Sequence, residues 1–335
     1  MKAYALQGSF GIDSLKPVER PEPVPGAGQV LLRMRAWSLN YRDLLMVTGF
    51  YNPKLRLPFT PLSDGVGEVV AVGSGVTRVK AGDRVAGIFM QQWLDGEITE
   101  AKGRSALGGA IDGVFAEQVV LEAEGVVHVP PHLSDEEAAT LPCAAVTAWR
   151  ALVTEGRLKA GDTVLIQGTG GVSLFALQFA RAHGARVIAT SSSDAKLARA
   201  RELGAEGTIN YRTTADWGQR VRELTGGTGV DHVVEVGGAG TFAQSMAAVR
   251  MGGRISLIGV LSGAGQVNPT PILMKSVCVQ GIFVGSRAMF EEMNRAISDH
   301  QMRPVVDRVF AFEELRDALR HLESAAHFGK IVLRR

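Results

Sequence analysis

The chain contains little cysteine and no excess of charge of either sign. Its two cysteines, Cys143 and Cys278, each lie in an apolar stretch. We therefore expect two buried, reduced thiols, with a disulfide or a reactive thiol as the alternative. The 36 basic residues nearly balance the 34 acidic ones and are scattered along the chain. This distribution argues against a protein that binds nucleic acid or a membrane surface.

Long apolar runs are also missing. No uncharged apolar segment approaches the roughly 20 residues that a membrane-spanning helix needs. The first residues lack the charged start and apolar core of a signal peptide, so we expect a cytoplasmic protein. What the chain has instead is length and glycine. Its 335 residues favour two domains, and its 40 glycines favour many tight turns.

Residues 1–125 are predicted to form a β-rich domain. The segments 29–37 and 65–72 alternate apolar with other residues, as half-buried strands do, and residues 114–121 repeat the pattern. Glycine-containing turns separate these short segments. Such spacing favours a small, irregular barrel.

Residues 126–286 show a different pattern of predicted elements. The first is a helix with Ser134 as its predicted N-cap and Glu137 three residues further on, as in a capping box. Strands and helices then alternate. The predicted strands are 162–167, 186–190, 208–210, 230–235, 254–258 and 276–284, and the predicted helices between them are 171–183, 195–203, 216–224 and 240–249. This alternation predicts a doubly wound parallel sheet with helices on both faces.

A glycine-rich turn joins the first of these strands to its helix. It reads Gly168-Thr169-Gly170-Gly171-Val172-Ser173. Gly168 permits a sharp turn, Gly170 allows a pyrophosphate to approach the backbone, and Ser173 is small enough for the helix to pack on the strand. The helix N-terminus then offers free N–H groups to the phosphates. The turn predicts a dinucleotide-binding site.

The end of the next strand indicates which dinucleotide is bound. Enzymes that use NAD commonly place a carboxylate there, whereas this chain has Ser191, Ser192 and Ser193. Small hydroxyl side chains leave room for a 2′-phosphate, to which Lys196 and Arg212 could supply charge. We therefore expect NADP(H) rather than NAD(H). The alternative is that the serines only cap the following helix, which we expect to start near Asp194.

Motifs spread over the whole length point to a known family. They are Ser38–Asp43 (SLNYRD), Pro61–Gly67 (PLSDGVG), Gly82–Val85 (GDRV), Leu141–Trp149 (LPCAAVTAW), the glycine turn and His327–Val332 (HFGKIV). With these motifs the chain resembles the medium-chain dehydrogenase/reductase superfamily, and within it the zinc-independent, quinone-oxidoreductase-like alcohol dehydrogenases. The resemblance implies a GroES-like catalytic domain over 1–125, completed by 287–335, and a Rossmann domain over 126–286.

The chain departs from the zinc-containing members of that family. They carry a cysteine where this chain has Asn40, and His-Glu where it has Ser63 and Asp64. The four-cysteine lobe that holds their structural zinc has no counterpart, because residues 89–113 contain no cysteine. Zinc sites need Cys, His and carboxylate ligands close together. We therefore expect a protein without zinc.

The resemblance places candidate catalytic residues beside the nicotinamide. Asn40 is expected to contact the substrate or the nicotinamide ribose. Tyr41 is expected either to donate a proton or only to pack. Asp43 belongs to this group, or only forms a structural ion pair with Arg42. Ser63 and Asp64 fill the position of the metal, where Asp64 orders the loop or acts as a base.

Further residues are expected to line the cofactor groove. Thr147 resembles a nicotinamide contact, although a helical threonine can also bond back to its own backbone. Tyr211 resembles a tyrosine that lies along the adenosine phosphate. Ligands bind beyond the carboxyl ends of parallel strands, which adds Gly237, Gly259, Phe283 and Val284. Phe328 and Lys330 are expected to close over the cofactor. An apolar substrate wall, or ordinary core, is expected from Tyr51, Phe89, Met90 and Trp93.

These observations favour an oxidoreductase that moves hydride between NADP(H) and a small alcohol or carbonyl substrate. The alternative enzyme reduces a quinone or an activated alkene (enone) with NADPH, and a remote alternative is a non-catalytic NADPH-binding protein. The apolar strand 276–284 would be exposed if it forms the sheet edge. Pairing with a second copy would cover it, so we expect a homodimer.

Overall fold

The computed structural model describes residues 1–259, 261–263 and 265–335. Contacts divide it into two compact units, one made of residues 1–146 and 284–335 and the other of residues 147–283. The C-terminal segment thus returns to the first unit. The first boundary differs from the predicted one, because residues 126–146 pack with the β-rich part. A strand at 126–128 pairs there, and a helix at 135–138 contacts the same sheet.

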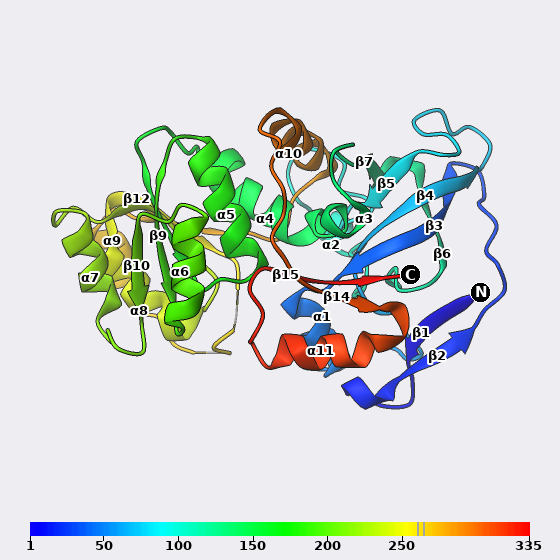
Figure 1. Ribbon diagram of the computed structural model, residues 1–335, viewed down its shortest axis with the longest axis horizontal. Coiled ribbons are helices and arrows are strands. Elements are labelled where there is room, and N and C mark those ends of the chain that lie inside the picture. Colours follow the sequence, from blue (N-terminus) through cyan, green and yellow to red (C-terminus); the bar gives the residue numbers. More distant parts are fainter. Residues whose placement is uncertain (260, 264) are drawn as a thin grey trace. The chain divides into compact units, whose positions relative to one another are not determined.

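The first unit is built from short strands (Figure 1). They are β1 (Lys2–Leu6), β2 (Leu15–Glu19), β3 (Gln29–Ser38), β4 (Asp64–Val72), β5 (Arg84–Gly87), β6 (Gln118–Glu122), β7 (Val126–His128), β14 (Val306–Ala311) and β15 (Lys330–Arg334). The main sheet has the order β14-β15-β3-β4-β5-β7, with β6 also paired to β3, while β1 and β2 pair separately. Its pairs are antiparallel apart from β14 with β15.

Helical segments of this unit cover or connect the strands. They are η1 (Ile12–Ser14), α1 (Tyr41–Val47), α2 (Glu100–Gly103), η2 (Ala123–Gly125), α3 (Asp135–Ala138), η3 (Leu141–Ala145), α10 (Arg287–Asp299), η5 (Phe312–Glu314) and α11 (Leu315–Glu323). Ser134 caps α3, and its capping box with Glu137 is confirmed by both reciprocal hydrogen bonds. Near the end of the chain, η5 is followed directly by α11.

Aromatic packing joins the C-terminal segment to the central strand. The ring of Phe312 stacks on Phe115 at 4.6 Å between centroids, and both rings contact Trp37 of β3. The strand predicted at 114–121 is shorter than expected, since β6 begins at Gln118. The reason is local, because the N–H groups of residues 113–115 donate to the carbonyls of residues 60–62 instead of joining a regular ladder.

The second unit is a parallel α/β sheet (Figure 1). Its elements are α4 (Val146–Trp149, starting at the boundary), η4 (Arg150–Thr154), β8 (Thr163–Gln167), α5 (Gly171–Ala182), β9 (Arg186–Ser191), α6 (Asp194–Glu202), β10 (Gly207–Asn210), α7 (Trp217–Leu224), β11 (Val230–Glu235), α8 (Ala239–Ala248), β12 (Val249–Leu257), α9 (Thr270–Met274) and β13 (Cys278–Gly281). The order β10-β9-β8-β11-β12-β13 confirms the predicted doubly wound sheet. The winding reverses between β8 and β11, and ligands of such sheets bind beyond the strand ends at that point.

The edge strand β13 departs from the prediction in length and burial. It spans Cys278–Gly281 rather than 276–284, and it lies at one edge of the sheet beside β12. Cys278 is exposed, so the expectation that both cysteines are buried is wrong for it. The edge position explains this, because the strand has a sheet neighbour on one side only.

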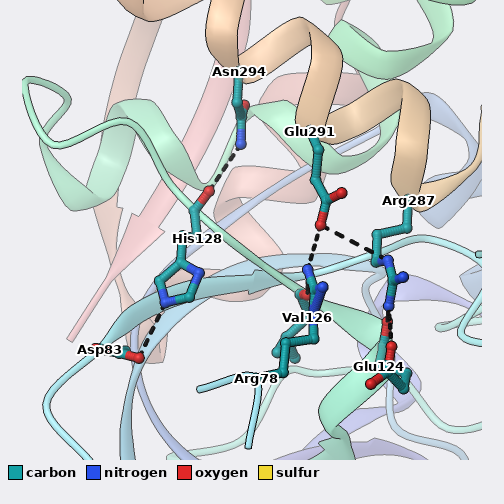
Figure 2. A network of polar contacts seen from close by, with 8 residues as sticks. All are labelled: Arg78, Asp83, Glu124, Val126, His128, Arg287, Glu291 and Asn294. Atoms are coloured by element: carbon teal, nitrogen blue, oxygen red, sulfur yellow. Dashed lines mark hydrogen bonds and ion pairs between the residues drawn. The ribbon is translucent and has the colours of Figure 1, made fainter. Parts of the chain in front are cut away.

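A polar network holds α10 against the strands of the first unit (Figure 2). The Glu291 carboxylate accepts a hydrogen bond from Arg78 and forms an ion pair with Arg287, whose guanidinium also reaches Glu124. Asn294 donates to the main-chain carbonyl of His128 at 2.9 Å. Through these contacts the returning chain is fixed to β7 and to the loop before β5.

Candidate functional site

Strand register brings the predicted catalytic residues of the first unit to one end of its sheet. Ser38, at the end of β3, pairs with Asp64 of β4 on one side and with Val332 of β15 on the other. Asn40 follows β3, Ser63 precedes β4, and Lys330 begins β15. Residues 290 positions apart in the sequence therefore meet at the same sheet end.

Lys330 places a cation in the middle of this group. Its side-chain Nζ donates to the main-chain carbonyl of Leu39 and to Oδ1 of Asn40, both at 2.6 Å. The residue is only 3% exposed. Burial lowers the pKa of Lys330, while the charge of Asp64 opposes that shift.

Asn40 is the N-cap of α1, but its side chain does not cap the helix in the usual way. An N-cap amide oxygen normally accepts a hydrogen bond from the first helical turn. Here that oxygen accepts from Lys330 instead. The remaining half of a capping box is present, since the Asn40 N–H donates to Oδ2 of Asp43 at 2.8 Å. The Asn40 Nδ2 atom is buried and faces Asp64, whose pKa the contact helps to lower, but it makes no hydrogen bond of ordinary geometry within the described chain.

Asp43 is a buried carboxylate with an unusual pKa. Burial raises the pKa of Asp43 to about 6, against the opposing charge of Arg42 and with a further rise from Asp64. The nearest Arg42 nitrogen lies 3.9 Å from Oδ1, so the two form an ion pair. Arg42 also donates to the carbonyl of Leu107 at 3.0 Å, which anchors it in the fold.

Ser63 and Asp64 form a second buried pair. The Ser63 hydroxyl donates to Oδ1 of Asp64 at 2.6 Å, and the main-chain N–H of Cys143 donates to Oδ2 at 3.1 Å. Burial raises the pKa of Asp64, and the nearby Lys330, Ser63 and Asn40 groups oppose the rise. Burial also raises the pKa of the Cys143 thiol, with the Asp64 charge as the next cause.

The aromatic candidates divide into core and surface. Phe89, Met90 and Trp93 are buried almost completely, and the Arg42 guanidinium lies 4.7 Å from the Phe89 ring. Tyr51 is about half exposed. Tyr41, the first residue of α1, is 41% exposed and is therefore not a packing residue of the core.

In the second unit the glycine turn lies between β8 and α5, as predicted. Gly168 adopts φ +69°, a left-handed conformation that favours glycine. A Cβ atom at Gly168 or Gly170 would meet no atom within 4 Å, so the space beside the turn is open. No side chain caps the N-terminus of α5. These features fit a dinucleotide pyrophosphate, which needs close approach and free N–H groups.

The serine-rich segment lies at the end of β9, next to the end of β10. Ser191 pairs with Asn210, and the Tyr211 N–H donates to the Ser191 carbonyl at 3.1 Å. The Ser193 hydroxyl accepts from the N–H of Lys196, so Ser193 caps α6, which begins at Asp194 as expected. Ser191 and Ser192 precede the cap, and Arg212 follows Tyr211 on the exposed surface.

The remaining cofactor candidates lie in both units. Thr147 is buried in α4, and Gly237 follows β11. Gly259 follows β12 and is closely packed, since a Cβ atom added to it would lie 2.0 Å from the Val236 main-chain oxygen. Phe283 ends the second unit and Val284 begins the returning part of the first. Phe328 is buried in the first unit, where its N–H donates to Asp307.

The sequence did not indicate a buried carboxylate beneath the glycine turn. Glu235, at the end of β11, is fully buried. It accepts hydrogen bonds from the side chains of Gln167, Thr241 and Ser245 and from the N–H groups of Gly237 and Gly238. Gln167 immediately precedes Gly168, so the network ties the turn to the loop after β11. The sequence feature that could have indicated this site is a glutamate at the end of an apolar strand beside the switch point.

The polar cluster of the first unit does not fit a zinc ion. Across the described ranges, no group of three or more His, Cys, Asp or Glu residues is placed to hold a metal ion. The Asn40 oxygen already binds an ammonium group, and both oxygens of Asp64 accept hydrogen bonds from protein donors. Zinc is bound in proteins by Cys, His and carboxylate side chains whose ligand atoms face the ion.

Comparison with known proteins identifies the family. Residues 26–131 match the alcohol dehydrogenase GroES-like domain, and residues 171–299 match the zinc-binding dehydrogenase domain. A zinc-type alcohol dehydrogenase-like protein of Schizosaccharomyces pombe is 47% identical over 332 residues, covering 97% of this chain and 96% of its own. The chain belongs to the medium-chain dehydrogenase/reductase superfamily. It is an oxidoreductase with a GroES-like and a Rossmann domain.

Solved structures agree with this assignment. A protein of Sinorhizobium meliloti described as an alcohol dehydrogenase has a TM-score of 0.94 and 45% identity, covering 100% of this chain and 98% of its own. An NAD-dependent alcohol dehydrogenase (TM-score 0.90, 35% identity) and a mycobacterial protein complexed with NADPH (0.84, 30%) both cover 100% of each chain. The neighbours therefore support a nicotinamide cofactor of either kind. No helix in the described part of the chain is long and apolar enough to cross a membrane.

More distant relatives act on other acceptors. The acryloyl-coenzyme A reductase of Metallosphaera sedula is 30% identical over 348 residues, covering 99% of both chains. A mycobacterial quinone oxidoreductase has a TM-score of 0.82 and 30% identity, covering 100% of both chains. Small-molecule acceptors are thus common to the relatives, although the acceptor itself varies.

The raised pKa of Asp43 predicts a pH-dependent stability. The folded protein binds the Asp43 proton more tightly than the unfolded chain, where the ordinary pKa is 3.8. This contribution to the free energy of unfolding is complete below pH 3.8 and is lost as the pH rises through about 6. The Asp43→Asn variant has no titrating group at this position, so its free energy of unfolding does not include this pH-dependent contribution. We expect the stability of the variant relative to wild type to increase by roughly 2–3 kcal/mol between pH 4 and pH 7, measured by urea unfolding. A constant difference across that range would contradict the assignment.

Proposed function

We propose that this oxidoreductase transfers hydride between NADP(H) and a small alcohol or carbonyl substrate without a zinc ion. The observation that carries the proposal is the buried Asn40 amide, whose Nδ2 contacts the Asp64 carboxylate but makes no hydrogen bond of ordinary geometry in the described structure. A buried donor without a well-formed hydrogen bond is costly. A substrate oxygen that gains negative charge during reduction would satisfy it and would be stabilised in turn.

The bound nicotinamide supplies or accepts the hydride. The chain's own residues bind and orient it. The turn 168–173 and the uncapped start of α5 bind the pyrophosphate, and the Glu235 network keeps that turn in place. Ser191, Ser192, Lys196, Tyr211 and Arg212 form the site for the 2′-phosphate.

In the first unit, Asn40 donates to the substrate oxygen. Tyr41 supplies the proton, because its phenol is exposed directly beside Asn40 in the chain. Ser63 is committed to the Asp64 carboxylate, and Asp64 also fixes the main chain at Cys143. Asp43 holds the Asn40 backbone. A second candidate is reduction of a quinone or an enone by the same donors, which is favoured by the relatives that act on those acceptors.

A substrate panel tests the proposal. NADPH oxidation is followed at its absorbance with aldehydes, ketones, enones and quinones, and NADP⁺ reduction is followed with the matching alcohols. We expect carbonyl reduction that reverses with alcohols and that persists after treatment with a zinc chelator. Turnover with quinones or enones alone would select the second candidate. Loss of activity on chelation would overturn the metal-free proposal.

The cofactor preference is tested at the end of β9. A carboxylate at this strand end repels a 2′-phosphate and accepts a hydrogen bond from a free ribose hydroxyl. Ser192→Asp is therefore expected to shift kcat/KM toward NADH by on the order of tenfold or more. The same change at the exposed Ser74 of the first unit serves as the control. A wild-type protein that prefers NADH would contradict the NADP(H) assignment.

We also propose a homodimer formed through the β13 edge. An unpaired strand edge tends to pair with another chain. Beside it in the sequence, α9 exposes two large apolar side chains, Leu273 at 77% and Met274 at 69%. We expect sedimentation of a dimer, and a monomer when Leu273→Asp and Met274→Asp are combined. Val24→Asp, at an equally exposed apolar residue of the first unit, should leave the dimer intact. A wild-type protein that is monomeric at micromolar concentration would contradict this proposal.

A further inference from the structure

The buried ammonium of Lys330 lies beside residues that, by the resemblance to the zinc-containing family members, correspond to zinc ligands. Asn40 and Ser63-Asp64 occupy the positions at which those relatives carry cysteine and His-Glu. Lys330 Nζ is hydrogen-bonded to the first of these residues at 2.6 Å. The negative charges of Asp64 and Asp43 both favour its charged form. A positive charge supplied by the chain itself thus stands among the residues that replace the zinc ligands.

The hydrogen bond also decides how the Asn40 amide is turned. An ammonium group can only donate, so the atom that faces Lys330 must be the amide oxygen. The amide nitrogen Nδ2 then faces the Asp64 carboxylate, a contact that helps to lower the Asp64 pKa, and it makes no hydrogen bond of ordinary geometry in the structure as described. Because Lys330 holds the oxygen, the side chain cannot rotate to cap α1. The donor of the site is oriented by a residue that does not itself have to touch the substrate.

Ordinary stability does not account for this arrangement. Removing a charged ammonium from water is unfavourable, and an apolar side chain of similar volume often fits a buried position as well or better. The desolvated Lys330 is compensated only in part by one carbonyl, one amide oxygen and nearby carboxylates. A feature that costs stability and orients a donor at a reaction site is typical of function.

We propose that Lys330 is a positioning residue that takes the place of the metal ion: its ammonium fixes the Asn40 amide oxygen, so that the Nδ2 hydrogens are presented to the reacting oxygen of the substrate. This inference rests on the proposed function, because it concerns the donor that the reaction uses. It assigns Lys330 a role different from closing over the cofactor.

Kinetics distinguish positioning from cofactor binding. Lys330→Met removes the donor and the charge, and we expect kcat to fall on the order of 10²-fold while the dissociation constant of NADPH, measured by fluorescence, stays near that of wild type. Lys330→Gln retains an N–H donor and should keep more activity than Lys330→Met. The double variant Lys330→Met/Asn40→Ala should be no slower than Asn40→Ala alone, because both changes remove one donor.

Lys275 provides a matched control. Its ammonium also donates to main-chain carbonyls, in the second unit. Lys275→Met is expected to lower stability without the fall in kcat. Lys330→Met would overturn the proposal if it weakened NADPH binding and left kcat at saturating cofactor unchanged. Additive losses in the double variant would overturn it as well.

A second experiment needs no turnover. If the ammonium occupies the metal position, restoring ligands should create a metal site only after Lys330 is removed. Asn40→Cys/Ser63→His/Lys330→Ala is expected to bind Co²⁺, seen as thiolate charge-transfer and d–d absorption, with Asp64 as a third ligand. Asn40→Cys/Ser63→His with Lys330 retained should bind it far more weakly. Equal Co²⁺ binding by both variants would overturn the proposal. A wild type inactive with every acceptor would contradict the proposed function separately, since the Co²⁺ comparison does not depend on activity.

Discussion

A buried ammonium group must find acceptors, and in the first unit this requirement links segments from both ends of the chain. Lys330 reaches Leu39 and Asn40 only because β15 pairs with β3, and β3 brings Asp64 alongside through β4. The stacked rings of Phe115 and Phe312 keep the C-terminal segment in place. The catalytic candidates thus depend on one set of strand pairings, so an error in register would separate the cation from its acceptors.

The second unit meets the opposite requirement, a buried carboxylate. Glu235 is surrounded by donors from β8, α8 and the loop after β11, among them Gln167 directly before the glycine turn. A fully satisfied buried network of this kind holds its members in one arrangement. The turn and the Gly237 loop, which flank the switch point of the sheet, are therefore held by the same Glu235 side chain. The first unit thus arranges its sheet end around the Lys330 ammonium and the neighbouring carboxylates, and the second arranges its loops around Glu235.

Local signals in the sequence predicted most elements of the fold. The Ser134 cap, the glycine turn and the strand and helix periods of the second unit depend on neighbours in the chain and are present as expected. Contacts between residues that are far apart in the sequence could not be predicted from such local signals. The contact of Lys330 with Asn40 spans 290 positions, and Glu235 meets Gln167 across 68. The exposure of Cys278 depends on which strand forms the sheet edge, and the irregular pairing of residues 113–115 depends on residues 60–62.

On the proposed assignment, a lysine in place of a metal ion changes what the site can do to a substrate oxygen. A zinc ion is a Lewis acid that lowers the pKa of a bound hydroxyl by several units. An amide N–H that is oriented by an ammonium group stabilises developing negative charge through a hydrogen bond. The ammonium group itself does not contact the oxygen. Alcohol oxidation and carbonyl reduction share one transition state, so this difference affects both directions alike. On the proposed assignment, the Asn40 N–H stabilises the charge on the oxygen in both directions, and the proton that reduction adds is the proton that oxidation removes.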